Sequence, residues 1–228
     1  MSNMIAHLAV AYEILKLNND IIKNEYAYYL GSVAPDTIGS KPDVTRNDKK
    51  IVHLREDISD IDWLNDECME LFNSRVFNFV NKYINNDVDI NQRDFNIGYL
   101  VHLSTDKWNH KTIRQKMLKY ANEIGINEKD KDFFYMMIND LEALDNYILE
   151  NNYYIQSIYN MITNDEVKYD LAGFIEKEYI SKSINWWNNE YLLGVKLKEL
   201  KYLKNEDIDY FIKVSSNNIV KELRELLK

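Results

Sequence analysis

The residues best suited to chemistry lie in one segment, where His102, Asp106 and His110 follow one another at four-residue spacing. In an α-helix, four residues advance a side chain about 40° beyond one full turn, so the three side chains would share one face. The neighbouring residues are apolar, which predicts a largely buried helix: Leu100, Val101 and Leu103. Burying an unpaired carboxylate is unfavourable, and a bound cation offsets that cost. Imidazole and carboxylate groups are the usual non-thiolate ligands of zinc, so the segment indicates a metal site.

A second interpretation of the same spacing needs no metal. His102 and Asp106 would then form an ordinary buried hydrogen bond across one helical turn, with His110 exposed at the helix end. The chain contains 4 histidines, and the other two are His7 and His53. Its single cysteine excludes an intramolecular disulfide and a cysteine-based zinc site. Any metal must therefore be bound by histidines and carboxylates.

The elements that must position these residues are predicted to be helices. Both prolines, Pro35 and Pro42, lie in one turn-rich segment over residues 31–43, and few glycines interrupt the rest of the chain. Apolar residues recur at helical spacing, most clearly from Asp60 to Tyr83. The predicted helices cover residues 3–17, 20–30, 60–83, 94–122, 129–150, 165–190 and 205–227, with Gly31 ending the second.

These helices predict an all-α fold, a multi-helix bundle forming a single domain over residues 1–228, with the irregular segment packed over one end. No alternating pattern long enough for a β-strand occurs. Three carboxylates within the predicted helix 129–150 are assigned to a solvated face rather than to a metal: Asp140, Glu142 and Asp145.

Charge and hydropathy restrict the partners. A net charge of -9 disfavours a protein that binds nucleic acid through clustered lysines and arginines. The sequence contains no run of about 18 apolar residues, so no transmembrane helix is predicted. The first residues lack the pattern of a secretory signal, so a cytoplasmic location is expected.

The order of these motifs resembles the zinc-dependent phospholipase C family. The matching features are His7 in an N-terminal helix, the GSVAPD motif ending a second helix, HLRED near residue 53, and His-x3-Asp-x3-His after a Gly-Tyr pair. That group includes bacterial phospholipases C and the amino-terminal domain of glycosylphosphatidylinositol-specific phospholipase D, and is more distantly similar to S1/P1 nucleases. The resemblance covers roughly the first 110 residues and implies a helical bundle of the phospholipase C / P1 nuclease type.

The resemblance also implies roles for individual residues. One zinc ion would be surrounded by two imidazoles and two carboxylates: Asp36, His53, His102 and Asp106. Asp106 would bridge toward a second zinc ion bound by His7, and His110 would face a further metal position or the substrate phosphate. Asp36 is the candidate general base.

Two departures from the family pattern limit the number of ions. The secreted phospholipases C use the amine of a processed N-terminal Trp as a ligand, whereas this chain begins MSNMIAH. They also carry a later His-x3-Glu pair, and no histidine follows His110 here. One or two zinc ions are therefore expected, and a third only if a carboxylate such as Asp140, Glu142 or Asp145 substitutes.

The resulting hypothesis is a zinc-dependent phosphoesterase that hydrolyses a phosphodiester through a metal-bound water, with a phospholipid headgroup or a smaller soluble phosphoester as substrate. The alternative is a non-catalytic, metal-stabilised helical module that has lost part of the active centre. A phosphohydrolase of the HD type is disfavoured because no histidine is directly followed by aspartate. The sequence leaves open the oligomeric state and whether Trp108, Trp186 or Trp187 contacts a membrane.

Overall fold

The computed structural model describes residues 3–86, 89–191 and 198–227, and their fold is all-α, as predicted. The described residues contain no β-strand, only an isolated bridge between Leu171 and Ile175. The α-helices are α1 (Met4–Leu17), α2 (Glu25–Val33), α3 (Arg46–Val52), α4 (Asp66–Tyr83), α5 (Ile90–Asn109), α6 (Gln115–Glu123), α7 (Lys131–Asn151), α8 (Tyr153–Asn164), α9 (Lys177–Trp186) and α11 (Asn205–Leu226). Short 3-10 segments, η1 (Asn19–Ile21) and η2 (Ala34–Ser40), and π-helical turns, η3 (His110–Arg114) and η4 (Trp187–Tyr191), complete them.

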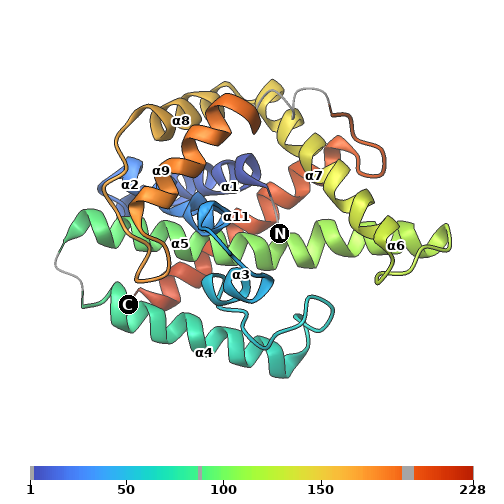
Figure 1. Cartoon of the computed structure of the whole chain (residues 1–228), viewed down its shortest axis with the longest axis horizontal. Coiled ribbons are helices and arrows are strands. Elements are labelled where there is room, and N and C mark those ends of the chain that lie inside the picture. The colour runs from blue at the N-terminus through green and yellow to red at the C-terminus, as the bar shows by residue number, and fades with distance from the viewer. Residues whose placement is uncertain (1–2, 87–88, 192–197, 228) are drawn as a thin grey trace.

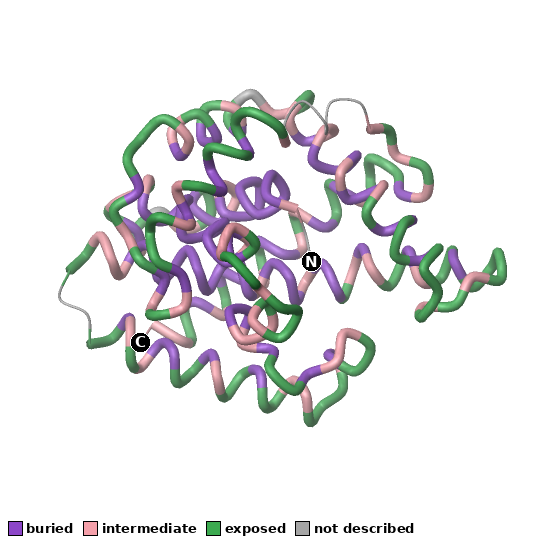
Figure 2. Tube along the Cα trace, in the orientation of Figure 1, coloured by how far each residue is buried: buried purple, intermediate pink, exposed green. Residues whose placement is uncertain are grey.

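Helix α5 runs through the middle of the molecule, with α1, α2 and α11 packed against it (Figure 1). Buried residues concentrate on α1, α2 and α5, while the outer face of α4 and the turn after α6 are exposed (Figure 2). The buried face of α5 is apolar along most of its length but also contains His102 and Asp106. Among the described residues, no helix has the length and apolar character needed to cross a lipid bilayer.

The second predicted helix differs from the structure at both ends. It begins at Glu25, where the Asn24 side chain accepts a hydrogen bond from the backbone of Ala27. It then continues through Gly31 to Val33 rather than ending there. The segment predicted as a turn-rich loop is helical as well, because η2 follows directly with Pro35 in its first turn.

The C-terminal half contains two further differences. The predicted helix over 165–190 begins only at Lys177, and the residues before it form an irregular segment with positive φ at Ala172 and Gly173. Helix α8, Tyr153–Asn164, was not predicted.

The assignment of Asp140 and Asp145 to a solvated helix face is wrong. Both side chains are fully buried, and each accepts backbone N–H groups from another element. Asp140 accepts from three consecutive residues shortly before α11, at 3.1, 2.7 and 2.7 Å: Lys201, Tyr202 and Leu203. Backbone hydrogen bonds compensate the burial of these two side chains. The two residues are therefore buried because they hold the starts of other helices in place, which their positions in the sequence do not reveal. Glu142 is half-buried and pairs with Lys198 at 2.9 Å.

Two glycines allow α2 and α5 to approach backbone to backbone. A Cβ atom on Gly31 would lie 2.0 Å from the carbonyl oxygen of Phe95, and one on Gly98 would lie 2.0 Å from that of Tyr28. No larger residue fits at either position without moving a helix. Because α2 leads into η2 and α5 contains the His102 segment, this crossing sets the distance between them.

We predict that Gly98→Ala lowers the free energy of unfolding by about 3 kcal/mol, because the added methyl group meets backbone rather than a movable side chain. Urea denaturation followed by circular dichroism measures the loss. Gly39→Ala is the matched control, since a Cβ there has no atom within 4 Å. Equal stability of the two variants would contradict the close approach of the helices.

Candidate metal centre

Five of the six predicted site residues converge from four separate elements. His7 lies in the second turn of α1, Asp36 in η2, His53 directly after α3, and His102 and Asp106 one turn apart on α5. The four side chains other than Asp36 are almost completely buried. The side chain of Asp36 remains 26% exposed, so the cluster opens toward solvent at this residue.

Two imidazoles and two carboxylates form the tightest part of the cluster. The Nε2 atoms of His53 and His102 lie 3.2 Å apart. Asp36 Oδ1 is 3.4 Å from the first and 3.9 Å from the second, and Asp106 Oδ2 is 3.8 and 3.9 Å from them. Zinc ligated tetrahedrally at about 2.0–2.1 Å separates its ligand atoms by about 3.3 Å. The donor atoms therefore have the chemistry and approximately the spacing of a zinc site.

Backbone carbonyl groups fix which nitrogen of each imidazole faces the cluster. His102 Nδ1 lies 2.9 Å from the carbonyl oxygen of Ser32, and His53 Nδ1 lies 2.7 Å from that of Lys49. A carbonyl oxygen only accepts, so both Nδ1 atoms must carry their protons and donate. In the neutral rings the two Nε2 atoms then present lone pairs to each other, and these repel unless a proton or a metal ion lies between them. Such second hydrogen bonds are the usual support of metal-binding histidines.

His7 faces the opposite oxygens of the same two carboxylates. Its Nε2 atom is 3.6 Å from Asp106 Oδ1 and 3.9 Å from Asp36 Oδ2. Its ring stacks on that of His102, with the centroids 3.8 Å apart. Donor atoms close enough to share an ion form two groups: His7, His102 and Asp106, and Asp36, His53 and His102.

The pKa values follow from burial among these charges. Burial lowers the pKa of His7 to about 3 and also lowers that of His102, which keeps both rings in the neutral form that binds metal. Burial alone would raise the pKa of both carboxyls. The surrounding imidazoles lower the pKa of Asp36 overall, and for Asp106 the positive charge of the N-terminal amine and then the imidazoles lower the pKa. Burial opposes a charge on His53, but its hydrogen bond with Asp36 and the nearby carboxylates raise the pKa overall.

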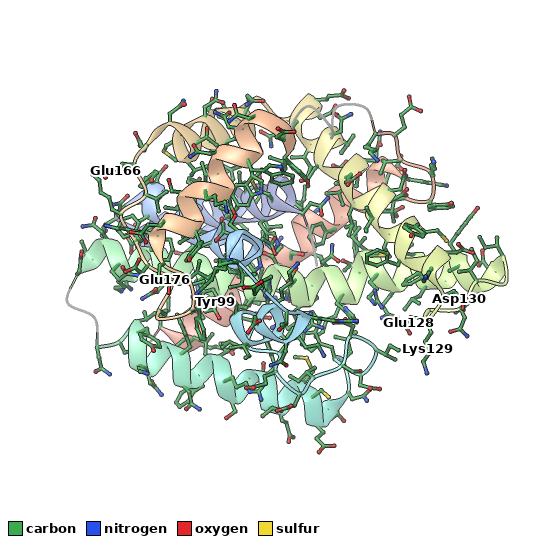
Figure 3. The ribbon with its side chains drawn as sticks, in the orientation of Figure 1. Tyr99, Glu128, Lys129, Asp130, Glu166 and Glu176 are labelled. Carbon is green, nitrogen blue, oxygen red and sulfur yellow. The ribbon has the colours of Figure 1, made fainter. Side chains whose placement is uncertain are left out.

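Residues outside the cluster hold its elements in place. Tyr99, near the middle of the molecule in Figure 3, donates a 2.7 Å hydrogen bond to the carbonyl of Val52, the residue before His53. Asp145 accepts the backbone N–H groups of Ile5 and Ala6 at 3.0 Å each, directly before His7. Burial raises the pKa of Asp145 to about 7, whereas these hydrogen bonds and the positive end of the α1 helix dipole favour its ionised form.

His110 lies outside both donor groups. Its ring packs edge-on against Trp63, with the centroids 5.1 Å apart, and the guanidinium of Arg55 lies 3.8 Å from the centre of the Trp63 ring. These contacts attach the segment after His53 to the end of α5. Burial lowers the pKa of His110 to about 3, and Arg114 adds to the effect.

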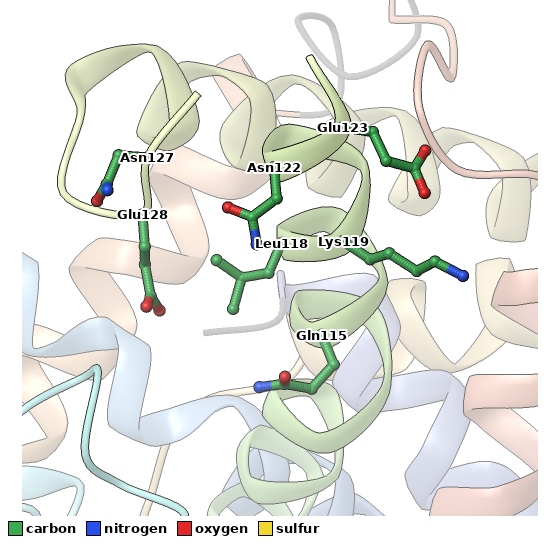
Figure 4. A pocket seen from close by; sticks show the side chains of 7 residues that line it. All are labelled: Gln115, Leu118, Lys119, Asn122, Glu123, Asn127 and Glu128. Carbon is green, nitrogen blue, oxygen red and sulfur yellow. The ribbon is translucent and has the colours of Figure 1, made fainter. Parts of the chain in front are cut away.

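A cavity of about 510 Å³ adjoins the cluster at Asp36. It lies between η2 and α9, which pack against each other. Ser183 of α9 donates to the Thr37 carbonyl at 3.2 Å and also hydrogen-bonds Ser40. A larger hollow of about 710 Å³ lies along α6 and contains none of the cluster residues (Figure 4).

Sequence reasoning did not identify the carbonyl groups of Ser32 and Lys49, the anchor Asp145, or the α9 side of the cavity. Any residue type can supply a carbonyl, so no sequence signal marks the first two. The α9 residues lie about 150 positions beyond Asp36, in a region without a recognised motif.

Comparison with known proteins agrees with this geometry. A family model for zinc-dependent phospholipase C matches residues 4–222, nearly the entire chain. The chain has no significant match to a curated protein or to a solved structure. The match extends well beyond the first 110 residues that carried the resemblance in the sequence, and it includes every residue of the cluster. The chain therefore belongs to the zinc-dependent phospholipase C family.

Proposed function

We propose that this protein is a zinc-dependent phosphodiesterase whose ligands are His7, Asp36, His53, His102 and Asp106. The observation that carries the proposal is the pair of Nε2 atoms 3.2 Å apart, with both Nδ1 protons donated to carbonyl groups. A dication satisfies these two lone pairs and also compensates the two carboxylates. Family membership supports zinc as the metal and a phosphoester as the substrate.

The carboxylates favour two ion positions. One oxygen of Asp36 and one of Asp106 face His53 and His102, while their other oxygens face His7. Asp106 can therefore bridge, as expected for it, while Asp36 lies between the two positions and is the more exposed of the two carboxylates. The imidazoles of His53 and His102, anchored by backbone carbonyls, would keep this arrangement rigid, so that binding metal requires little rearrangement of the chain.

Zinc at this position would supply a water of lowered pKa and would stabilise negative charge on the phosphoryl oxygens. Asp36 is the candidate general base, because it is the one cluster residue that is partly exposed and that lines the neighbouring cavity. A carboxylate there can accept a proton from water entering through the cavity. The cavity is large enough to hold a phosphodiester headgroup.

The competing function is a structural metal site. Such a site is closed and fully ligated by protein, whereas a catalytic site keeps one position open. The exposure of Asp36 and the cavity beside it favour the catalytic role.

We predict that His102→Ala and Asp36→Ala each lower bound zinc at least tenfold and reduce phosphodiester hydrolysis to background, because each removes a ligand that no neighbouring side chain replaces. Zinc is measured by atomic absorption on protein purified without a His tag, and hydrolysis with bis(4-nitrophenyl) phosphate and short-chain phosphatidylcholine.

The control for these substitutions is Glu70→Gln, which removes an exposed carboxylate from α4. It should keep wild-type zinc and activity. Full zinc content and activity in His102→Ala would contradict the ligand assignment. Zinc binding by the wild type without hydrolysis of either ester would instead favour the structural role.

A second prediction concerns His110, which serves as the matched histidine control. His110→Gln should retain zinc, because the ring packs on Trp63 rather than in a donor group. The pKa of His110 is lowered in the folded protein to about 3, so the unfolded chain binds the proton more tightly. Stability linked to this ring is therefore present above pH 6.5 and is lost as the pH falls toward 3.

Urea denaturation of the metal-free protein between pH 7 and pH 4 measures this linkage. The free energy of unfolding should fall less steeply with acidification in His110→Gln than in the wild type. Loss of zinc from this variant would contradict the prediction and would indicate that His110 is a zinc ligand.

A further inference from the structure

The cavity beside the cluster has a composition that restricts its occupant. We define the α9 cleft by six of its lining residues: Asp36, Ser40, Lys41, Lys182, Trp186 and Trp187. The first three come from η2 and the residue after it, and the others from α9 and the start of η4. The cleft thus connects the metal-facing carboxylate with two ammonium groups and two indole rings.

If Asp36 binds the metal, the remaining charged side chains of the α9 cleft are positive. Among the described residues, no other carboxylate lines it. Lys182 is exposed, and within the described residues its ammonium group has no carboxylate at ion-pair distance. It donates a hydrogen bond to the Ser40 carbonyl at 3.4 Å. Lys41 is partly compensated by Glu176, at 2.8 Å on the outer side (Figure 3 labels Glu176). Lys182 therefore provides the uncompensated charge.

The tryptophans supply a surface for a second part of the ligand. Trp187 is buried and supports the cleft, while Trp186 is 54% exposed. Aromatic rings can also bind a quaternary ammonium group. Here the two lysines would repel such a cation, and no free carboxylate would attract it. The charge therefore favours an anionic ligand group over a cationic one.

We propose that the α9 cleft is a headgroup subsite that selects phosphodiesters carrying a second negative charge, with Lys182 as the specificity-determining residue. This inference rests on the proposed phosphodiesterase function. The scissile phosphate would lie at the Asp36 end, and the second anionic group would meet Lys182 and Lys41. An anionic phospholipid headgroup and a soluble anionic diester both offer this chemistry.

The test compares two substrates that differ by a single carboxylate, dihexanoyl phosphatidylserine and dihexanoyl phosphatidylethanolamine. With zinc-loaded wild type, kcat/KM should be higher for the serine lipid. In Lys182→Gln this preference should fall about fivefold, the size expected for losing one partly solvated ion pair. The matched control is Lys177→Gln, which removes an exposed lysine of the same helix that does not line the cleft.

The same two compounds without acyl chains, glycerophosphoserine and glycerophosphoethanolamine, show whether the subsite binds a phospholipid headgroup or a soluble diester. Cleavage of the dihexanoyl esters alone, with the serine preference, assigns the subsite to a lipid headgroup. Cleavage of both sets with that preference assigns it to the diester itself. A wild type that hydrolyses the ethanolamine lipid as well as the serine lipid, with no effect of Lys182→Gln, overturns the subsite while leaving the phosphodiesterase function intact.

Binding separates failure of the subsite from failure of catalysis. If no ester is hydrolysed, the phosphodiesterase proposal fails, and tryptophan fluorescence, to which Trp186 contributes, is titrated with the two glycerophosphodiesters. Tighter binding of glycerophosphoserine that is lost in Lys182→Gln and kept in Lys177→Gln supports the anionic subsite. Equal affinity for both compounds overturns it.

Discussion

The constraint on which the structure depends is the burial of Asp106 among three imidazoles. This carboxylate is 1% exposed and lies 3.6 to 3.9 Å from the Nε2 atoms of His7, His53 and His102. Burying so many polar groups without compensation would cost several kcal/mol, yet they occupy the centre of the bundle, on its most buried helices. The zinc ion proposed for these groups would offset that cost, and it would also account for the convergence of four elements at one point.

The surrounding bundle maintains that point through buried contacts of two kinds. Glycines at the crossing of α2 and α5 let the Ser32 carbonyl reach His102. Buried aspartates bind the starts of other elements: Asp145 holds the first turn of α1, and Asp94 accepts the backbone N–H groups of Lys23 and Asn24 at 2.7 Å before α2. These contacts fix α1, α2 and α5 around the cluster, which is the rigidity that a preorganised metal site requires.

The electrostatics of the site differ from those of the chain as a whole. The net charge of -9 predicts repulsion of anionic partners, but the α9 cleft presents lysines beside the cluster. Local fields of this kind decide which ligands enter a cleft, because distant surface charges are screened by salt within about 10 Å. The proposed preference for an anionic headgroup therefore does not conflict with an acidic composition.

The sequence by itself determined the helical class and the residue types of the site. The four-residue spacing of His102 and Asp106 already placed both on one helix face, because helical periodicity is a local property. The order of His7, the GSVAPD motif and His53 was enough to suggest the family, and the match over residues 4–222 confirmed it. The helix ends were predicted less accurately. Gly31 was predicted to end the second helix, whereas α2 continues through it and the glycine allows a close approach between α2 and α5.

Only the tertiary structure decided which of these side chains meet. His110 shares the spacing of its two partners, but α5 changes to a π-helical turn at this residue, and its ring packs on Trp63. Asp140 and Asp145 looked like solvated acids because their partners, backbone N–H groups 60 to 140 residues away, have no residue-type signature. The α9 cleft likewise exists only because α9 packs on η2. Spacing along one helix can be read locally, whereas contacts between distant segments depend on how the complete core packs.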